Sequence, residues 1–177
     1  CDEEDAPNIK DEKAFFTHFL ERVDWKRDLH FQTKTTIDTL DYSGDKLNEG
    51  SKVVIAAVGE IKRTLSSKLN IDLPVGFSNP RYASDGNLVI EGKGEITLLI
   101  SSLQEQNLDN IALITLVDDS AFVSKDFSNW LWVTFTRSNP ANDIYGLNSE
   151  TKSKHFSCTL PIIDARIKEH HAPVLER

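Results

Sequence analysis

The feature that most constrains the fold is a seven-residue apolar run at residues 111–117, IALITLV, which ends directly in Asp118 and Asp119. A short, continuous, β-branched run of this kind is typical of a strand that is covered on both faces of a sheet. Residues 95–106 before it carry apolar side chains at helical spacing, and residues 124–137 after it do the same. Alternating strands and helices predict an α/β layered sandwich, with a central, mostly buried sheet and flanking helices.

The same patterns assign further segments. Three apolar runs indicate strands, at residues 53–57, 87–90 and 161–165. Amphipathic helices are predicted at residues 12–22 and 58–69. Ser124 is expected to cap the helix over residues 124–137, whose apolar face then carries Trp130.

The composition is typical of a folded, water-soluble domain. With 177 residues the chain can bury roughly 70% of its unfolded surface, so we expect one domain over residues 1–177. The chain is 39% hydrophobic and 27% charged and has no long apolar run, which argues against a membrane span. A net charge of −8 argues against a nucleic-acid partner.

The chain also contains a weak internal repeat. An amphipathic segment that ends in an arginine is followed by a turn that ends in an aspartate. Two pairs occupy these positions: Arg22 and Asp28, and Arg137 and Asp143. Each copy then passes through a polar loop into an apolar strand, and this shared order of elements indicates duplicated halves at residues 1–70 and 107–177.

Two cysteines, Cys1 and Cys158, lie at opposite ends of the chain without CxxC spacing. This placement argues against a disulfide framework or a thiolate metal site, and it favours a reducing cytoplasm. Two interpretations of Cys1 remain open. It is either the lipidated end of a processed lipoprotein or, as we favour, the end of a severed strand, because residues 1–4, CDEE, resemble residues 117–120, VDDS.

Several residues with chemical potential are given structural roles. Asp118 and Asp119 lie at a strand end, where α/β sheets bind ligands, but helix capping or solvent exposure is favoured for both. His155, His170 and His171 lack the spacing of a metal-binding set. We therefore assign no catalytic residue and no metal ligand.

The three tryptophans can be interpreted as a stacking surface or as core residues. Two of them lie on a predicted helix that needs an apolar face, so core packing is favoured for all three: Trp25, Trp130 and Trp132.

A structural motif is expected where the helix over residues 124–137 ends. Arg137 can donate to the last helical carbonyls and to the carboxylate of Asp143, while Pro140 prevents the helix from continuing. A salt bridge between Arg137 and Asp143 is the simplest prediction, and a catalytic role for the pair is less favoured.

Three blocks carry a family resemblance: residues 132–146, WVTFTRSNPANDIYG; residues 154–156, KHF; and residues 162–176, IIDARIKEHHAPVLE. They resemble the carboxy-terminal domain of the UbiD family of prenylated-flavin-dependent aromatic acid decarboxylases. The resemblance spans about residues 23–176. It implies a non-oxidative decarboxylase of aromatic or conjugated acids, such as quinone precursors.

The resemblance also implies that the complete enzyme uses prenylated FMN, a divalent metal (Mn or Mg) and potassium. The family's active-site arginine and two glutamates lie in earlier domains, so no cofactor is expected in this chain and the chain alone is expected to be inactive. Its implied partners are the upstream domains of the same enzyme and further copies in a homo-oligomer. In that setting the domain would cover the active site.

A fourth block, residues 33–43, TKTTIDTLDYS, is similar to a family loop that reaches toward the active site. Ile37 and Leu40 are therefore substrate-pocket candidates, with core packing an equally open alternative. The competing hypothesis for the whole chain is a free-standing, non-enzymatic binding module or a surface lipoprotein.

Overall fold

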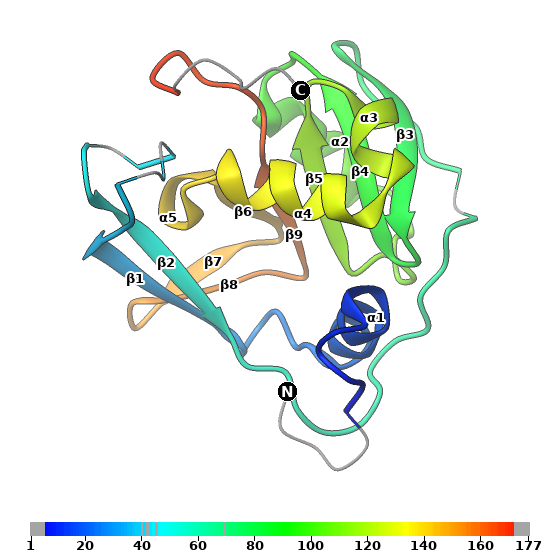
Figure 1. Ribbon diagram of the computed structural model, residues 1–177. Coiled ribbons are helices and arrows are strands. Elements are labelled where there is room, and N and C mark those ends of the chain that lie inside the picture. The colour runs from blue at the N-terminus through cyan, green and yellow to red at the C-terminus, as the bar shows by residue number, and fades with distance from the viewer. Residues whose placement is uncertain (1–5, 40, 42, 45, 69, 172–177) are drawn as a thin grey trace.

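The computed structural model describes residues 6–39, 41, 43–44, 46–68 and 70–171. At its centre is a five-stranded mixed sheet in the order β3-β4-β5-β9-β6 (Figure 1). These strands are β3 (Phe77–Ser84), β4 (Asn87–Gly92), β5 (Leu113–Val117), β9 (Leu160–Asp164) and β6 (Ile144–Leu147). β4, β5 and β9 run parallel, whereas β3 and β6 form antiparallel edges.

Helices cover both faces of this sheet, which confirms the predicted α/β sandwich. The helices are α2 (Ile96–Gln104) on one face, and α3 (Ser120–Lys125) and α4 (Phe127–Thr136) on the other (Figure 1). Every residue of β5 is buried, because alternate side chains enter two separate apolar clusters. Ile114 and Leu116 pack with α2, while Leu113 and Val117 pack in the cluster that contains Trp130 of α4.

The amino-terminal part forms a unit beside the main sheet. It comprises α1 (Glu12–Arg22) and a two-stranded antiparallel hairpin of β1 (Leu29–Thr36) and β2 (Glu49–Ile55) (Figure 1). A short helix, α5 (Pro140–Asp143), contacts this hairpin, and β7 (Glu150–Lys152) pairs with β8 (His155–Ser157) in a third small sheet. Among the described residues, no helix is long and apolar enough to cross a membrane.

The helix predicted at residues 58–69 is wrong. The described part of this segment forms neither a helix nor a strand, and its polar groups are used by distant partners. The N–H groups of Lys62 and Arg63 both donate to the carbonyl of Glu21, and the Arg63 guanidinium donates to the carbonyls of Leu20 and Val23. The segment therefore satisfies the carbonyls at the end of α1 instead of forming a helix of its own.

The helix predicted over residues 124–137 is split, so the expected cap at Ser124 is also wrong. Asp126 adopts an extended backbone between α3 and α4, and its carboxylate accepts from the N–H of Ser128 at 2.7 Å. The buried residues of α4 are Trp130, Val133 and Thr134. Trp130 is fully buried as expected and Trp25 is buried, but Trp132 is 58% exposed, which corrects its assignment to the core.

Candidate functional site

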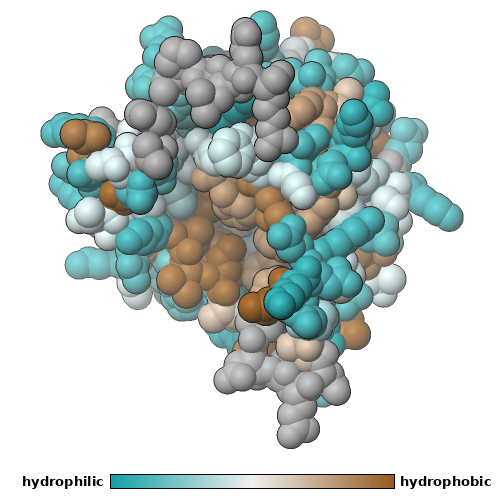
Figure 2. Space-filling model, viewed as in Figure 1, coloured by the Kyte–Doolittle hydropathy of each residue, from teal (hydrophilic) through white to brown (hydrophobic). Residues whose placement is uncertain are grey.

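An apolar cavity of about 400 Å³ lies between the amino-terminal unit and the central sheet. Figure 2 shows hydrophobic residues gathered in a hollow on this face of the molecule. The cavity is lined by Phe15, Phe16, Phe19, Trp25, Leu29, Asp41, Ser51, Lys52, Val53, Ile55, Leu113, Phe135, Ser138, Pro140, Ile144, Pro161 and Ile163. Its volume falls within the range of ligand pockets in proteins.

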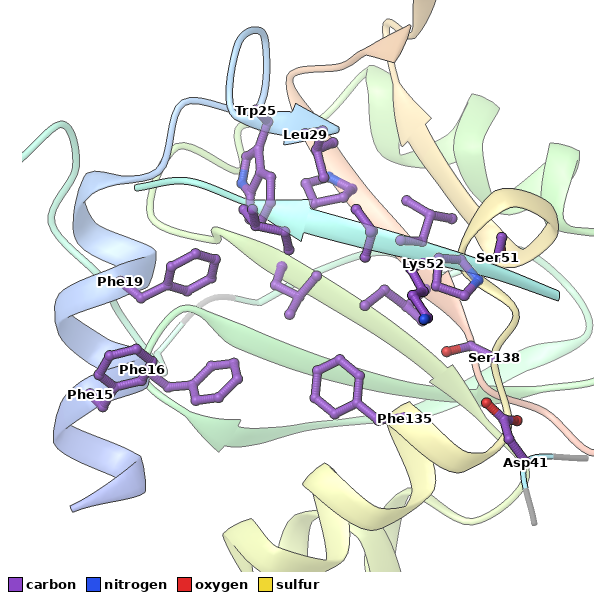
Figure 3. Close-up of a pocket in the computed structure, with 17 residues that line it drawn as sticks. Phe15, Phe16, Phe19, Trp25, Leu29, Asp41, Ser51, Lys52, Phe135 and Ser138 are labelled. Carbon is purple, nitrogen blue, oxygen red and sulfur yellow. The ribbon is translucent and has the colours of Figure 1, made fainter. Parts of the chain in front are cut away.

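The two ends of the cavity differ in chemistry. The phenylalanines of α1 lie at one end, whereas Lys52, Ser138 and Asp41 lie toward the other (Figure 3). The Asp41 carboxylate accepts from both the N–H and the hydroxyl of Ser43, and the Lys52 ammonium has no partner among the described residues. The site is thus a mainly apolar slot with one unpaired cation near its rim.

Two polar contacts fix the amino-terminal unit against the rest of the fold. The Trp25 indole N–H donates to the carbonyl of Ala112 at 2.7 Å, just before β5. On the opposite side, the Ser51 hydroxyl of β2 bonds with the amide oxygen of Asn139 and accepts from the N–H of Ala141 at 2.8 Å. These contacts hold the walls of the cavity at fixed positions.

The turn after α4 is closed by Asp143. Its carboxylate accepts from the backbone N–H of Asn139 at 2.6 Å, and its own N–H donates back to the Asn139 carbonyl at 2.8 Å. Pro140 occupies the first turn of α5, where a missing N–H costs nothing. The backbone N–H and carbonyl of Asn139 are therefore both satisfied within the turn.

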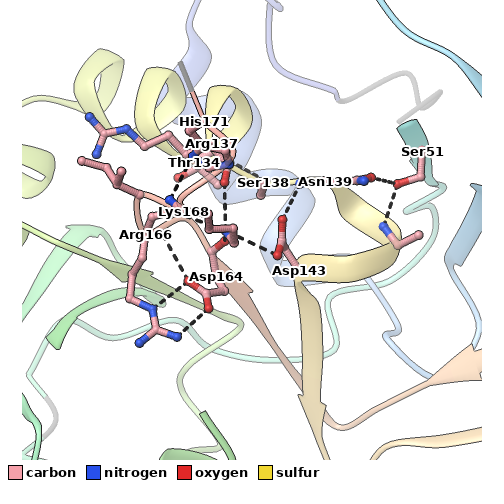
Figure 4. Close-up of polar contacts among 12 residues, drawn as sticks. Ser51, Thr134, Arg137, Ser138, Asn139, Asp143, Asp164, Arg166, Lys168 and His171 are labelled. Carbon is pink, nitrogen blue, oxygen red and sulfur yellow. Dashed lines mark hydrogen bonds and ion pairs between the residues drawn. The ribbon is translucent and has the colours of Figure 1, made fainter. Parts of the chain in front are cut away.

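A buried ionic cluster adjoins the turn at the carboxyl end of β9 (Figure 4). The Asp164 carboxylate binds the Arg166 guanidinium through two contacts, at 2.9 and 2.6 Å. The Lys168 ammonium lies 3.4 Å from the Asp143 carboxylate and also donates to the carbonyls of Asp164 and Arg137, at 2.8 and 3.1 Å. Lys168 thus links the turn, the end of α4 and the end of β9.

The environment shifts the pKa values of several groups in and beside this cluster. Burial raises the pKa of Asp143, although the Asn139 N–H and Lys168 favour its charged form. Burial also acts to raise the pKa of Asp164, but the bonds and charge of Arg166 outweigh it and the pKa is lowered. Burial, together with the nearby charge of Lys168, lowers the pKa of His171 to about 4.

The expected salt bridge between Arg137 and Asp143 does not form. The Arg137 guanidinium lies 3.7 Å from Asp118, and Asp143 pairs with Lys168 instead. Asp118 also accepts from the N–H of Ile167, while Asp119 caps α3 through the N–H of Phe122. The capping expected for Asp119 is confirmed, and Asp118 anchors the segment that follows β9.

Of the two substrate-pocket candidates, the structure describes Ile37 and does not describe Leu40. Ile37 is buried and is not part of the cavity wall. It packs within its own hairpin, where a Cβ on Gly44 or Gly50 would approach the Ile37 Cδ1 to 2.6 or 2.9 Å. Leu40 lies outside the described residues, so its contact with a substrate stays a prediction.

The histidines considered as metal ligands do not converge on one site. His155 contacts the carbonyl of Lys26, whereas His171 packs on its neighbour His170 and accepts from the N–H of Lys168. In the part of the chain that the structure describes, no group of three or more histidine, cysteine, aspartate or glutamate side chains could hold a metal ion.

Sequence patterns give no indication of the cavity or of the role of Lys168. The cavity is lined by residues from segments that are distant along the chain, including α1, β2, α4 and β9, and no local sequence spacing indicates such an arrangement. Lys168 lies in a block that is distinguished by its family resemblance alone. The sequence signal that could have indicated its role is its position four residues after Asp164, the aspartate at the end of the strand.

The helix, turn and hairpin that frame the cavity lie in the segment of the chain that matches a known family of domains. Residues 1–57, which contain all of this unit, match the family model of the 3-octaprenyl-4-hydroxybenzoate carboxy-lyase carboxy-terminal domain, UbiD_C. The chain is thus related to the carboxy-terminal domain of the UbiD family of decarboxylases, as its sequence blocks imply.

Individual relatives extend the match through most of the chain. A Chlamydia pneumoniae protein, named as one of the subunits of 4-hydroxybenzoate decarboxylase, is 32% identical over 166 residues, which are 89% of this chain and 27% of that protein. An uncharacterised Chlamydia trachomatis protein is 33% identical over 144 residues, 81% of this chain and 25% of that protein. The chain therefore spans about a quarter of the length of these relatives. No solved structure matches.

Proposed function

We propose that this chain is the carboxy-terminal domain of a UbiD-like non-oxidative decarboxylase that acts on an aromatic acid, with a quinone precursor such as 4-hydroxybenzoate as its substrate class. The match of residues 1–57 to the carboxy-lyase domain carries this proposal. The name of the Chlamydia pneumoniae relative supports the choice of acid. The chain alone would be inactive, because the reacting groups would belong to domains that precede it.

The role proposed for the domain is to cover the active site of those domains. The connection between β1 and β2, which includes Ile37, belongs to the amino-terminal unit. Placed over the substrate, this loop would exclude water and contribute apolar surface. The exposed side chains of Phe122 and Trp132 on α3 and α4 are suited to contacts between copies in a homo-oligomer. We place the protein in the cytoplasm.

Membership of the UbiD family implies prenylated FMN in the complete enzyme. When bound, that flavin would supply the electron sink for decarboxylation. The buried cations of this chain are already used, since Arg166 binds Asp164 and Lys168 binds Asp143 and three carbonyls. We therefore assign neither the flavin phosphate nor a metal to residues of this domain.

A domain exchange tests the proposal. In the Chlamydia pneumoniae relative, the matching segment would be replaced by this chain, and carbon dioxide release from 4-hydroxybenzoate would be measured with flavin supplied. We expect activity in the exchanged protein and none in a protein that lacks the segment. A folded, flavin-loaded exchange protein that decarboxylates no aromatic acid would count against the proposal, as would flavin binding by the isolated chain.

A further inference from the structure

The outer edge of β2 carries backbone groups that no strand of the described chain pairs with. β2 pairs with β1 alone. Because the N–H of Ala56 donates to the carbonyl of Asp28, the hydrogen-bonding pattern turns the backbone groups of Ser51, Val53 and Ile55 away from β1. The same three residues line the cavity. The free edge and the cavity are therefore one feature.

The carboxy-terminal half contains the same arrangement with this edge occupied. The Asp28 carboxylate accepts from the N–H of Asp24 at 2.8 Å, as Asp143 does from Asn139 at 2.6 Å. After each turn, a strand pairs antiparallel with a later strand, in the registers Leu29↔Ile55 and Ile144↔Ile163. The difference is that β9 also pairs in parallel with β5 on its other side.

A cation also closes the end of each helix, although the two cations lie at different positions after their strands. Arg63, which follows β2, donates to the carbonyl of Val23 at 2.7 Å, at the end of α1. Lys168, which follows β9, donates to the carbonyl of Arg137 at 3.1 Å, at the end of α4. The turn and the hairpin register thus agree in the two halves, so β2 is the equivalent of β9.

One buried N–H marks the place of the strand that the amino-terminal half does not show. The N–H of Ala165, which follows β9, donates to the carbonyl of Leu116 in β5 at 2.9 Å. The equivalent residue after β2 is Ala57, and both alanines are 0% exposed. Among the described residues, the Ala57 N–H has no acceptor. A buried N–H is normally paired, so an acceptor is expected beside it.

A comparison of the helices α1 and α4 indicates the same position for this strand. In α4 the Trp130 indole N–H donates to the Thr115 hydroxyl at 2.9 Å, so this side chain lies on β5. When Arg22 is aligned with Arg137, the equivalent of Trp130 on α1 is Phe15, which lines the cavity (Figure 3). The cavity therefore occupies the position that a β5-like strand would fill.

We propose that the cavity is a strand-accepting slot, in which an extended apolar segment that leads into Cys1 pairs in parallel with β2, as β5 pairs with β9. In sequence, residues 1–4, CDEE, resemble residues 117–120, VDDS, which directly follow β5. Residues 1–5 themselves lie outside the described residues. The relatives, more than three times as long as this chain, show that similar domains occur within longer polypeptides. The proposal rests on the geometry within this chain and is independent of the decarboxylase assignment.

The chain supplies its own probe for this slot. Residues 111–119, IALITLVDD, form the strand that occupies the equivalent position in the carboxy-terminal half. One experiment adds this peptide, with a dilysine tail for solubility, to the intact chain. A second fuses residues 111–117 directly before Cys1. In both, amide hydrogen exchange at Ile55 and Ala57 should slow by about tenfold or more, and the fused protein should melt several degrees higher.

A Leu116→Pro version of each probe is the matched control, because the Leu116 backbone faces β9 in the fold, where its carbonyl accepts from the N–H of Ala165, and proline at this position removes the N–H that would face β2. It should give much less protection. Unchanged exchange at Ile55 and Ala57 with both probes would overturn the proposal, and so would equal protection by the proline versions. The slot would also be reassigned if 4-hydroxybenzoate alone gave the same protection, or if two copies of the chain paired through β2.

Discussion

The Lys168 ammonium lies 3.4 Å from the Asp143 carboxylate and is the cation that this buried carboxylate meets. Both side chains are largely buried, with 21% and 8% of their surfaces exposed. Lys168 also covers carbonyls at the ends of α4 and β9. One side chain therefore stabilises the end of a helix, the end of a strand and a carboxylate together.

Lys168→Ala should lower the free energy of unfolding by on the order of 2–4 kcal/mol, because Asp143 would be left buried without its cation. Urea unfolding measures the loss. Lys152→Ala is the matched control, since Lys152 is exposed on β7 and should change stability by less than about 0.5 kcal/mol. Equal effects of the two substitutions would show that the ion pair contributes nothing.

Asp28→Ala and Asp143→Ala should both be destabilising, each by about 1–3 kcal/mol, because each leaves a turn N–H without its acceptor. Asn at either position keeps one oxygen and should recover part of the loss. Thermal and urea unfolding of the four variants would measure this. If only one of the two alanine variants were destabilised, the two turns would not be energetically equivalent.

Stability should fall as the pH is lowered from about 6.5 toward 4. The pKa of His171 is lowered from 6.5 to about 4 in the folded protein, chiefly by burial, so the unfolded chain binds the proton first in this window. In the fold, its Nε2 is buried without a partner in the described structure. His171→Gln should flatten the dependence of the urea midpoint on pH, whereas the exposed His170→Gln should preserve it.

The Cys158 thiol should resist alkylation while the protein is folded. Burial raises its pKa to about 12, and its side chain packs against Gly146. Little thiolate is present at pH 8, and the alkylating reagent has no access. Mass spectrometry of the peptide that contains Cys158 should show slow iodoacetamide labelling in buffer and rapid labelling in denaturant. Fast labelling under native conditions would place the thiol at the surface.

In a complete enzyme, Leu40→Ala should change the preference among aromatic acids while leaving flavin content and melting temperature nearly unchanged. Ile37→Ala should behave differently, because Ile37 packs against Gly44 and Gly50, and its loss should cost roughly 2–5 kcal/mol. Competition assays with paired acids and thermal unfolding separate the two effects. A stability loss at Leu40 with unchanged preference would assign that residue to the core.

The central layers of the fold could be predicted from sequence because their signals are local. The run at residues 111–117 and the spacing of apolar residues in α2 fix a strand and a helix wherever they pack. Residues 58–69 could not be assigned this way, because their conformation depends on carbonyls of α1 roughly forty residues earlier. The local helical pattern was overridden by contacts with α1, which lies too far along the chain to fall within a short sequence window.

The candidate site was predictable only in part, for a related reason. The turn at Asn139 and Asp143 follows from a proline and an aspartate close together, so its existence was evident. The choice of cation for Asp143 was not, since Lys168 and Arg137 are both near and only the packing of Asp118 decides between them. The cavity depends on elements from distant parts of the chain that meet in space.

The bond between the Trp25 indole and the Ala112 carbonyl joins residues 87 positions apart. Closing so long a loop is entropically costly, so we expect the sheet of β3, β4 and β5 to collapse first and the amino-terminal unit to attach last. Trp25 would then report the final step of folding as a slow change in fluorescence. During synthesis, α1 and its hairpin would leave the ribosome before β5, and they could not dock on the main sheet until β5 had also left it.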